Sequence, residues 1–283
     1  MLERSRGLSP TALDAIAELE QRVVAADGGR LKLEWGNLRT RPTDQVTDFL
    51  WWQERLLVGF CGIYRFGGAV PEIAGMVDPG ARRRGIASTL LDAAVDNIRG
   101  SGISRLLLVV PRPSVAGREF ALRRGGALDH SEHALLLGGE PADGRSDPDI
   151  TLRRASVADA GAVGRILQAA FEWLPPDLEQ LLARESATEY TLVAELCGEP
   201  VGTVRVTQDG DTGGIYGFAV EPRLQGRGIG RDVLRRCCRM LRADGMRQVG
   251  LEVAVENERE LGLYTSIGFR PVTTEDYYAL TFG

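Results

Sequence analysis

Hydrophobic positions along the chain follow two periods, and their order predicts an alternation of strands and helices. In the second half, apolar runs and alternating patterns predict strands, and apolar residues spaced three or four apart predict helices. The expected strands are 150–154, 190–197, 201–207, 214–220, 248–255 and a closing pair within 269–282, and the expected helices are 157–173, 176–184, 228–243 and 259–267. This order predicts an α+β fold with a mixed, mostly antiparallel sheet flanked by helices.

The first half shows the same order of elements. Its helices are expected at 11–26 and 85–99, and its strands at 48–52, 56–66, 73–77, 105–110 and 127–137, the last of which would close the sheet. Val77 to Ala87 also repeats Val220 to Gly230 at a constant offset of 143 residues. A period this long indicates duplicated domains. We expect them at 1–140 and 150–283, joined by a segment rich in turn-forming residues.

A glycine-rich turn, Gln225 to Gly230, lies between a predicted strand and a predicted helix. Glycine lets the backbone approach a ligand closely, and the first N–H groups of a helix attract anions. The spacing fits neither the dinucleotide-binding fingerprint nor the phosphate loop of NTPases. The turn therefore predicts a site for an anion of another type.

The turn and its setting resemble the acetyl-CoA pyrophosphate loop of the GCN5-related N-acetyltransferases. A second motif of that family follows in the expected order, with Asn257 ahead of Leu263-Tyr264 and Gly268-Phe269. The resemblance covers nearly the whole chain, although only the second half carries strong motifs. It implies two tandem GNAT-like domains, each with the predicted α+β architecture.

The resemblance also implies which residues of the second half bind acetyl-CoA (coenzyme A). Backbone groups at the strand end would hold the pantetheine arm, and those of the turn would hold the pyrophosphate. The residues expected to bind the carrier are Phe218, Ala219, Val220, Gln225, Gly226, Arg227, Gly228, Ile229, Gly230, Asn257 and Tyr264. Helix capping by Asn257 would explain that residue equally well.

Three residues are candidates for proton transfer. Tyr264 stands where the family has its general acid. Alternatively, Tyr264 is a tyrosine of the hydrophobic core without a catalytic role. Many members carry a glutamate base near 214–216, where this chain has Gly214-Ile215-Tyr216. Glu252 is the better candidate base, since it alternates with the aliphatic residues of its strand, and a solvated strand glutamate is the alternative. Tyr216 is a candidate for orienting a water that relays the proton.

The first half departs from the motif at the matching positions. Ala121 stands where the second half has Tyr264, Val109 where it has Glu252, and Ser114 where it has Asn257. The first domain is therefore expected to be degenerate, with Glu72 as its one candidate base. Its turn remains a possible second cofactor site, made of Val77, Arg82, Arg83, Arg84, Gly85, Ile86 and Ala87.

Composition narrows the partners. The formal charge of −5 and the pI near 5.3 argue against nucleic acid, which requires a basic face, and favour an amine substrate, either a small molecule or a peptide. Glu172, Asp177 and Glu179 indicate a cationic acceptor, with substrate choice expected in 169–187 and 273–278. The basic clusters beside the two turns, Arg82-Arg83-Arg84 and Arg235-Arg236, are candidates for binding CoA phosphates or are solvated helix ends.

The remaining expectations are negative or general. The four cysteines and two histidines lack the spacing of a disulfide framework or metal site. No signal peptide or apolar stretch of membrane-spanning length is seen in the sequence, so a cytoplasmic protein without membrane contact is expected. A monomer or homodimer is expected as well.

The sequence thus predicts an acetyl-CoA-dependent N-acetyltransferase that acts by direct transfer in a ternary complex, with chemistry in the second domain. The tandem layout resembles the mycothiol synthases, in which a glutamate is expected at Gly214, and the local motif resembles the ribosomal-protein alanine N-acetyltransferases. A CoA-binding regulatory or scaffold protein without turnover is the alternative.

Overall fold

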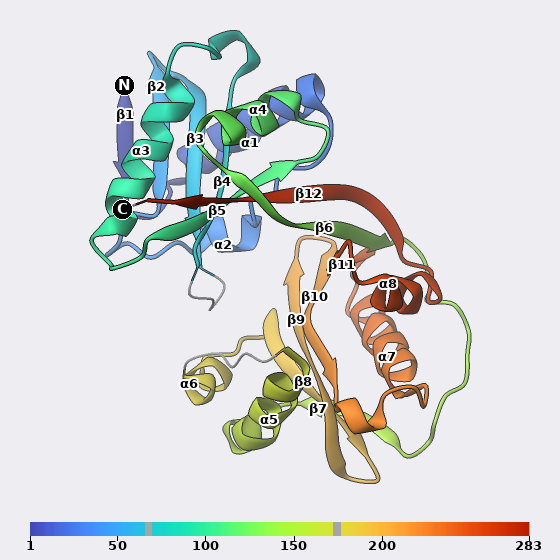
Figure 1. Ribbon diagram of the computed structural model, residues 1–283. Helices are drawn as coiled ribbons and strands as arrows, with labels where there is room; N and C mark the ends of the chain where they lie inside the picture. Colours follow the sequence, from blue (N-terminus) through green and yellow to red (C-terminus); the bar gives the residue numbers. More distant parts are fainter. Residues whose placement is uncertain (66–69, 172–176, 283) are drawn as a thin grey trace. The chain divides into compact units, whose positions relative to one another are not determined.

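The computed structural model describes residues 1–65, 70–171 and 177–282, which form two compact units (Figure 1). Unit 1 comprises Met1–Glu132 together with Thr273–Gly283, and unit 2 comprises His133–Val272. Within each unit, helices cover both faces of the strands. The predicted fold class is confirmed.

Unit 1 is built on six strands in the order β1-β2-β3-β4-β5-β12, of which only β4 and β5 are parallel neighbours. Its strands are β1 (Leu2–Ser5), β2 (Asp48–Gln53), β3 (Leu56–Tyr64), β4 (Glu72–Val77), β5 (Arg105–Pro111) and β12 (Arg270–Thr281), and its helices are α1 (Pro10–Asp27), α2 (Trp35–Arg39), α3 (Ile86–Arg99) and α4 (Val115–Arg123). The sequence pattern did not predict β1, α2 and α4.

Alternation along the strands divides the core of unit 1 between two faces. On β3, Phe60 packs with residues of α1, whereas its neighbour Cys61 packs with Leu90 and Leu91 of α3. Successive side chains of a strand point to opposite faces, so a strand covered by helices on both sides is apolar throughout. This explains why the burial pattern of β3 is nearly continuous.

Unit 2 repeats this plan in the order β6-β11-β10-β9-β8-β7, with β10 and β11 as parallel neighbours. Its strands are β7 (Ile150–Arg154), β8 (Glu189–Leu196), β9 (Glu199–Asp209), β10 (Thr212–Val220), β11 (Gln248–Ala254) and the end of β6 (Ala127–Leu137), and its helices are α5 (Ala160–Phe171), α6 (Leu178–Ala183), α7 (Ile229–Ala243) and α8 (Glu258–Thr265). Helices α5 and α6 pack on one face, and α7 and α8 on the other.

The last strand of each sheet differs from the prediction. A single long strand, β12, replaces the expected closing pair, and its Glu275–Thr281 segment pairs with β5 of unit 1 (dark red in Figure 1). In unit 2, β6 stands next to β11. The two repeats have thus exchanged their final strands, and the units differ from the predicted domains 1–140 and 150–283. Hydrophobic pattern defines a strand but not the sheet edge that it joins, which explains the difference.

The join between the repeats is an ordered strap along α7. Arg242 Nε donates to the Gly139 carbonyl at 3.1 Å, and Arg236 Nη2 donates to the Asp147 carbonyl at 2.7 Å. Asp232 accepts the Asp147 N–H at 2.8 Å. Turn-forming residues without periodicity are here fixed by the arginines of one helix.

Candidate active site

Both glycine turns have the backbone of an anion cradle. In unit 2, Gly226 and Gly228 have φ of 79° and 88°, and α7 begins at the next residue, Ile229. In unit 1, Arg83 and Gly85 have φ of 62° and 80° ahead of α3. The glycine at each helix start has no side chain to cap it, and a β-carbon added there would meet no atom within 4 Å. The first helical N–H groups therefore face open space, where an anion is favoured.

A divergence of two parallel strands accompanies each turn. The β4–β5 ladder ends at Ala74↔Val109, and the β10–β11 ladder ends at Ile215↔Leu251. Beyond those pairs the strands separate, which leaves the strand-end backbone available for an extended ligand. In unit 2 a bulge between Tyr216 and Ala219 also interrupts the pairing of β10 with its other neighbour, β9.

The carbonyl at each strand end is held by the first residue of its turn. Gln225 Nε2 donates to the Val220 carbonyl at 3.1 Å, and Arg82 Nε donates to the Val77 carbonyl at 3.1 Å. These residues match in the repeat, so the same contact fixes the turn against the strand in both units. A carbonyl has two lone pairs, and a second donor can still be accepted.

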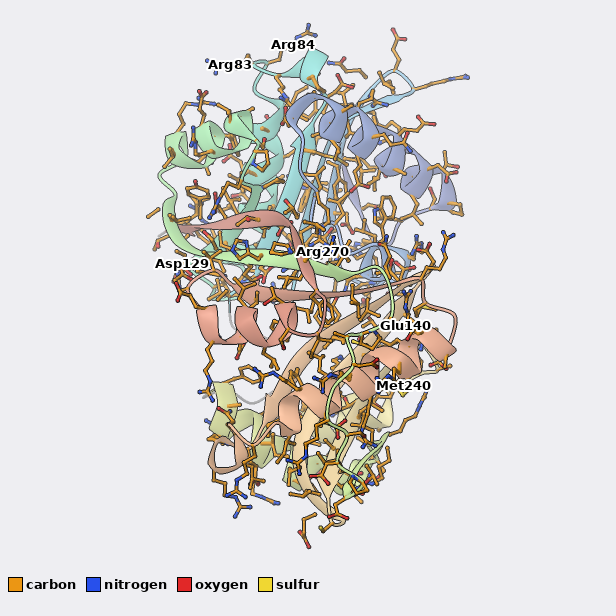
Figure 2. All side chains as sticks on the ribbon, turned by 90° about the vertical axis from the view of Figure 1, so that its right-hand side faces the viewer. Arg83, Arg84, Asp129, Glu140, Met240 and Arg270 are labelled. Carbon is orange, nitrogen blue, oxygen red and sulfur yellow. The ribbon has the colours of Figure 1, made fainter. Side chains whose placement is uncertain are left out.

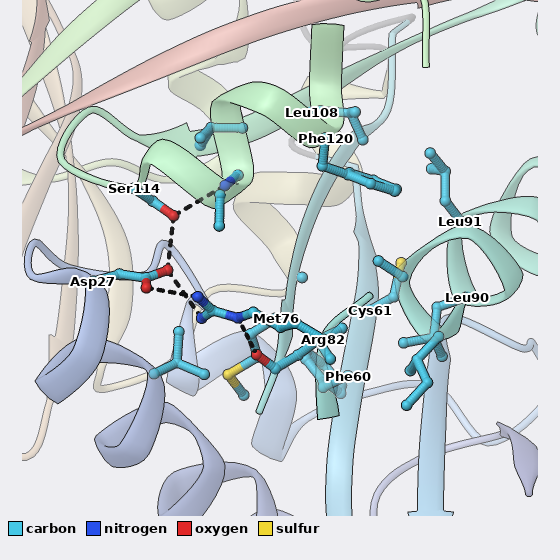
Figure 3. Close-up of a pocket in the computed structure, with 18 of the residues that line it drawn as sticks. Asp27, Phe60, Cys61, Met76, Arg82, Leu90, Leu91, Leu108, Ser114 and Phe120 are labelled. Atoms are coloured by element: carbon cyan, nitrogen blue, oxygen red, sulfur yellow. Dashed lines mark hydrogen bonds and ion pairs between the residues drawn. The ribbon is translucent and has the colours of Figure 1, made fainter. Parts of the chain in front are cut away.

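A cavity of about 380 Å³ lies at the turn of unit 1 (Figure 3). Most of the residues labelled there are apolar, including Phe60, Cys61, Met76, Leu108 and Phe120. Burial raises the pKa of the Cys61 thiol to about 12, so this cysteine is a neutral wall of the cavity rather than a nucleophile.

The polar end of this cavity is a network around Asp27. Arg82 Nη1 and Nη2 donate to the two Asp27 oxygens at 2.8 and 3.0 Å, and Ser114 Oγ donates to Asp27 at 2.8 Å. The family resemblance gave no sign of Asp27, which lies 55 residues from Arg82 in the sequence. Only the fold brings the end of α1 to the turn.

Tyr264 lies within the core of unit 2. Its side chain is on α8, 6% exposed, with its ring edge-on to Phe269 at 6.1 Å between centroids. Burial, followed by the negative charge of Glu260, raises its pKa well above the usual value. The phenol therefore stays protonated, as a proton donor must.

Glu252 and Tyr216 come from two neighbouring strands. Glu252 is half-buried on β11 and alternates with Leu251 and Val253, which pack in the same cluster as Tyr264. Glu252 therefore points to the opposite face of β11 from Tyr264. Tyr216 is 39% exposed on β10, where the ladder to β11 has just ended.

Asn257 is the N-cap of α8. Its Oδ1 accepts the Glu260 N–H at 3.1 Å. The capping role, one of the two offered by the sequence, is confirmed. Any contact of Asn257 with the carrier stays a prediction.

The basic pairs have different surroundings from those expected. Arg236 bonds Asp232 and the strap, and Arg235, 8% exposed, donates to the Arg145 carbonyl. The hydrogen bonds of both side chains lie within unit 2, and Arg235 Nε is buried without a hydrogen-bond partner among the described residues. These contacts do not support the suggestion that the pair binds CoA phosphates. Arg83 and Arg84, in contrast, are at the tip of the unit 1 turn (Figure 2).

The predicted acceptor region is only partly described. Glu172 lies outside the described residues, Asp177 precedes α6, and Glu179 is in its first turn. The segment 273–278 is part of β12 in unit 1 rather than a hairpin of unit 2.

Among the described residues, no group of three or more His, Cys, Asp or Glu side chains is placed to hold a metal. No helix in the described ranges is long and apolar enough to cross a membrane.

In unit 1, the residues that replace the motif have structural roles. Ser114 caps α4 by accepting the Gly117 N–H at 3.2 Å, and Ala121 is fully buried. Val109 packs with Leu107 and Tyr277. The carboxylate of Glu72 lies 3.7 Å from Lys32 Nζ, a partner that the sequence pattern did not predict.

Comparison with known proteins agrees with the duplicated plan. The model of the acetyltransferase (GNAT) family matches residues 14–125 and again 161–269. A mycothiol acetyltransferase of Amycolatopsis mediterranei (strain U-32) is 31% identical over an alignment of 237 residues, and the match covers 75% of this chain and 76% of that protein.

Solved structures share the fold over the full length. A GCN5-related N-acetyltransferase from Sphaerobacter thermophilus superposes with a TM-score of 0.81 at 18% identity, covering 99% of this chain and 95% of that one. A tandem GNAT protein from the clavulanic acid biosynthesis pathway superposes with a TM-score of 0.71 at 18% identity, covering 100% and 99%.

Proposed function

The chain belongs to the acetyltransferase (GNAT) family and is an N-acetyltransferase with two such domains, and we propose that unit 2 carries the chemistry. In this proposal acetyl-CoA donates its acetyl group to a primary amine of a small molecule or peptide, directly and within a ternary complex. The observation that carries it is that the open glycine turn of unit 2 lies in a unit that also holds Tyr264 and Glu252. The matching positions of unit 1, whose turn is also open, are Ala121 and Val109.

The carrier would bind along this path. The N–H groups at the start of α7 would bind the pyrophosphate, and the backbone from Phe218 to Val220 would pair with the pantetheine arm. The end of the β10–β11 ladder at Ile215 supports this, because the backbone of β10 beyond it is not paired with β11. The bulge in the β9–β10 pairing leaves a residue of β10 unpaired in the same segment.

The acceptor must lose a proton before it attacks, and the departing thiolate must gain one. Glu252 is proposed as the base and Tyr264 as the acid. They lie on opposite faces of β11, so a thioester at the strand edge would meet the amine from one side and the phenol from the other. Burial raises the pKa of Tyr264, so the phenol carries its proton before the thiolate departs, and the proposed donation depends on the position of the phenol rather than on acid strength.

A mycothiol-synthase-like activity is the second candidate. The 31% identity to a mycothiol acetyltransferase favours it, whereas Gly214 in place of the expected glutamate stands against it. Assays with that acceptor and with peptide amines distinguish the two.

Calorimetric titration of acetyl-CoA tests the proposal. Gly228→Glu places a carboxylate in the cradle of unit 2, and Gly228→Ala is the control with similar backbone strain but no charge. Loss of one site in the glutamate variant alone supports the proposal, and Gly85→Glu gives the same test for the second cofactor site in unit 1. Absence of binding by the unaltered protein would refute it.

A further inference from the structure

Lys32 is the only lysine of the chain; the other members of its 34 lysine and arginine residues are arginines. It follows α1 in unit 1, and its side chain is only 8% exposed. A position that keeps a lysine in a chain so rich in arginine indicates that the compact ammonium group matters there, because the two cations differ in shape and hydrogen-bonding geometry.

The ammonium group of Lys32 is enclosed by three oxygen-bearing side chains, which we call the amine cage. Its Nζ donates to Tyr277 Oη at 2.6 Å and lies 3.5 Å from Glu132 and 3.7 Å from Glu72. Nζ is also 5.2 Å from the centre of the Tyr277 ring. An ammonium has three donors and no acceptor, and each member of the cage offers an acceptor oxygen.

The cage is fixed by its own contacts. Tyr277 Oη donates its proton to Glu132 at 2.6 Å, so its lone pairs face Lys32. His130 stacks on the Tyr277 ring at 4.2 Å between centroids. The tyrosine therefore presents an acceptor in a set orientation, and the carboxylates of Glu72 and Glu132 lie near the same ammonium group.

The cage adjoins the cavity of unit 1. Leu31, next to Lys32, lines that cavity, and so does Val109, which packs with Tyr277. On β4, Met76 lines the cavity and shares a strand face with Glu72 by alternation.

We propose that the amine cage is a binding site for a primary alkylammonium group and that Lys32 fills it from within the chain. Unit 1 then holds an amine site closed by its own side chain, which excludes external amines. The evidence for the cage is the set of contacts within unit 1, which does not depend on the proposed function. Only a role of the cage in acetyl transfer would rest on that proposed function.

Chemical rescue tests the proposal without acetyl-CoA. Lys32→Ala removes the ammonium and leaves space for propylammonium, which supplies the atoms beyond the β-carbon. Lys32→Met is the matched control, because it also lacks the charge but keeps the space filled. Each protein is melted in propylammonium chloride, in tetramethylammonium chloride and in sodium chloride of equal ionic strength.

We expect propylammonium to raise the Tm of Lys32→Ala with the logarithm of its concentration, and to leave the unaltered protein and Lys32→Met at their Tm in sodium chloride. Adding Glu72→Gln to Lys32→Ala should weaken the rescue. If Lys32→Ala does not melt cooperatively, the same comparison is made on refolding yield. Equal responses of all three proteins, or an equal effect of tetramethylammonium, would overturn the cage while leaving the proposed function untouched.

Discussion

The ring of Tyr216 lies over Gly214, two residues earlier on the same strand. A β-carbon at Gly214 would be 2.6 Å from Tyr216 Cε2 and would also clash with the Thr207 hydroxyl. Gly214→Ala should therefore cost about 1–3 kcal/mol of unfolding free energy. Tyr216→Ala should relieve part of that cost in the double variant, so denaturant melts should show non-additive effects. Gly230→Ala is the control, since its β-carbon would lie 3.6 Å from its nearest neighbour, Phe218. Fully additive changes would show that the ring does not exclude a side chain at Gly214.

The same strand shows where reasoning from sequence stopped short. Gly214 pairs with Thr207 and Gly250, whereas Glu72 pairs with Tyr64 and Leu107, their counterparts in the repeat. Glu72 thus occupies the place of Gly214 in its own sheet. The offset of 143 misses this equivalence by one residue, because the bulge of β10 adds a residue that no hydrophobic pattern reveals.

Other parts of the fold and site could be predicted because their signals are local. The turn at Gly228, the helix that follows it and the cap at Asn257 depend on residue types within a few positions. The contact of Asp27 with Arg82 and the cage around Lys32 depend on the fold bringing distant segments together. Neither has a spacing that a sequence can display.

Tyr264→Phe should separate binding from chemistry. The substitution removes one hydroxyl and keeps the ring against Phe269, so the core of unit 2 should stay packed. If the phenol protonates the leaving thiolate, kcat should fall roughly 100-fold while the Kd of acetyl-CoA changes little. Steady-state kinetics and calorimetry on the same protein measure both. A weaker Kd with unchanged kcat would contradict the assigned role.

The ion pair of Asp159 and Arg153 should affect how the free energy of unfolding falls at acid pH. Arg153 donates to both Asp159 oxygens at 2.9 and 2.7 Å, and the Ser156 N–H donates to the same carboxylate. The hydrogen bond from Arg153 is the largest cause that lowers the pKa of Asp159. A lowered folded-state pKa gives stability that is present above the unfolded value near 4 and is lost as pH falls below it.

Asp159→Asn should therefore lower the unfolding free energy at pH 7 by about 1 kcal/mol, because it removes the charge of the group that accepts from Arg153 and Ser156. The loss should be no larger, since Arg153 is partly exposed and solvent screens the pair. Its stability should then decline less steeply than that of the unaltered protein between about pH 5 and pH 2. Asp211→Asn is the matched control, because Asp211 also binds an arginine, Arg247, but is exposed. If the free energy of unfolding fell equally steeply below pH 5 in both variants and the unaltered protein, this account would be contradicted.

Removal of β12 should damage unit 1 rather than unit 2. A chain that ends at Val272 lacks the Glu275–Thr281 segment, which pairs with β5. This segment contributes Tyr278 and Leu280 to one buried cluster of unit 1 and Tyr277 to another. The edge of β5 would then be exposed, and an unpaired apolar edge is prone to opening and association. Hydrogen exchange followed by mass spectrometry should show lost protection in β4 and β5, with β8, β9 and β10 protected as in the unaltered chain.

Addition of a peptide spanning 270–283 should restore protection to β5, whereas a peptide with Tyr278→Asp should not, because it would bury a charge. If the final strand instead completed the second repeat, as the domain boundaries expected from the sequence imply, protection would be lost in β11 and its neighbours.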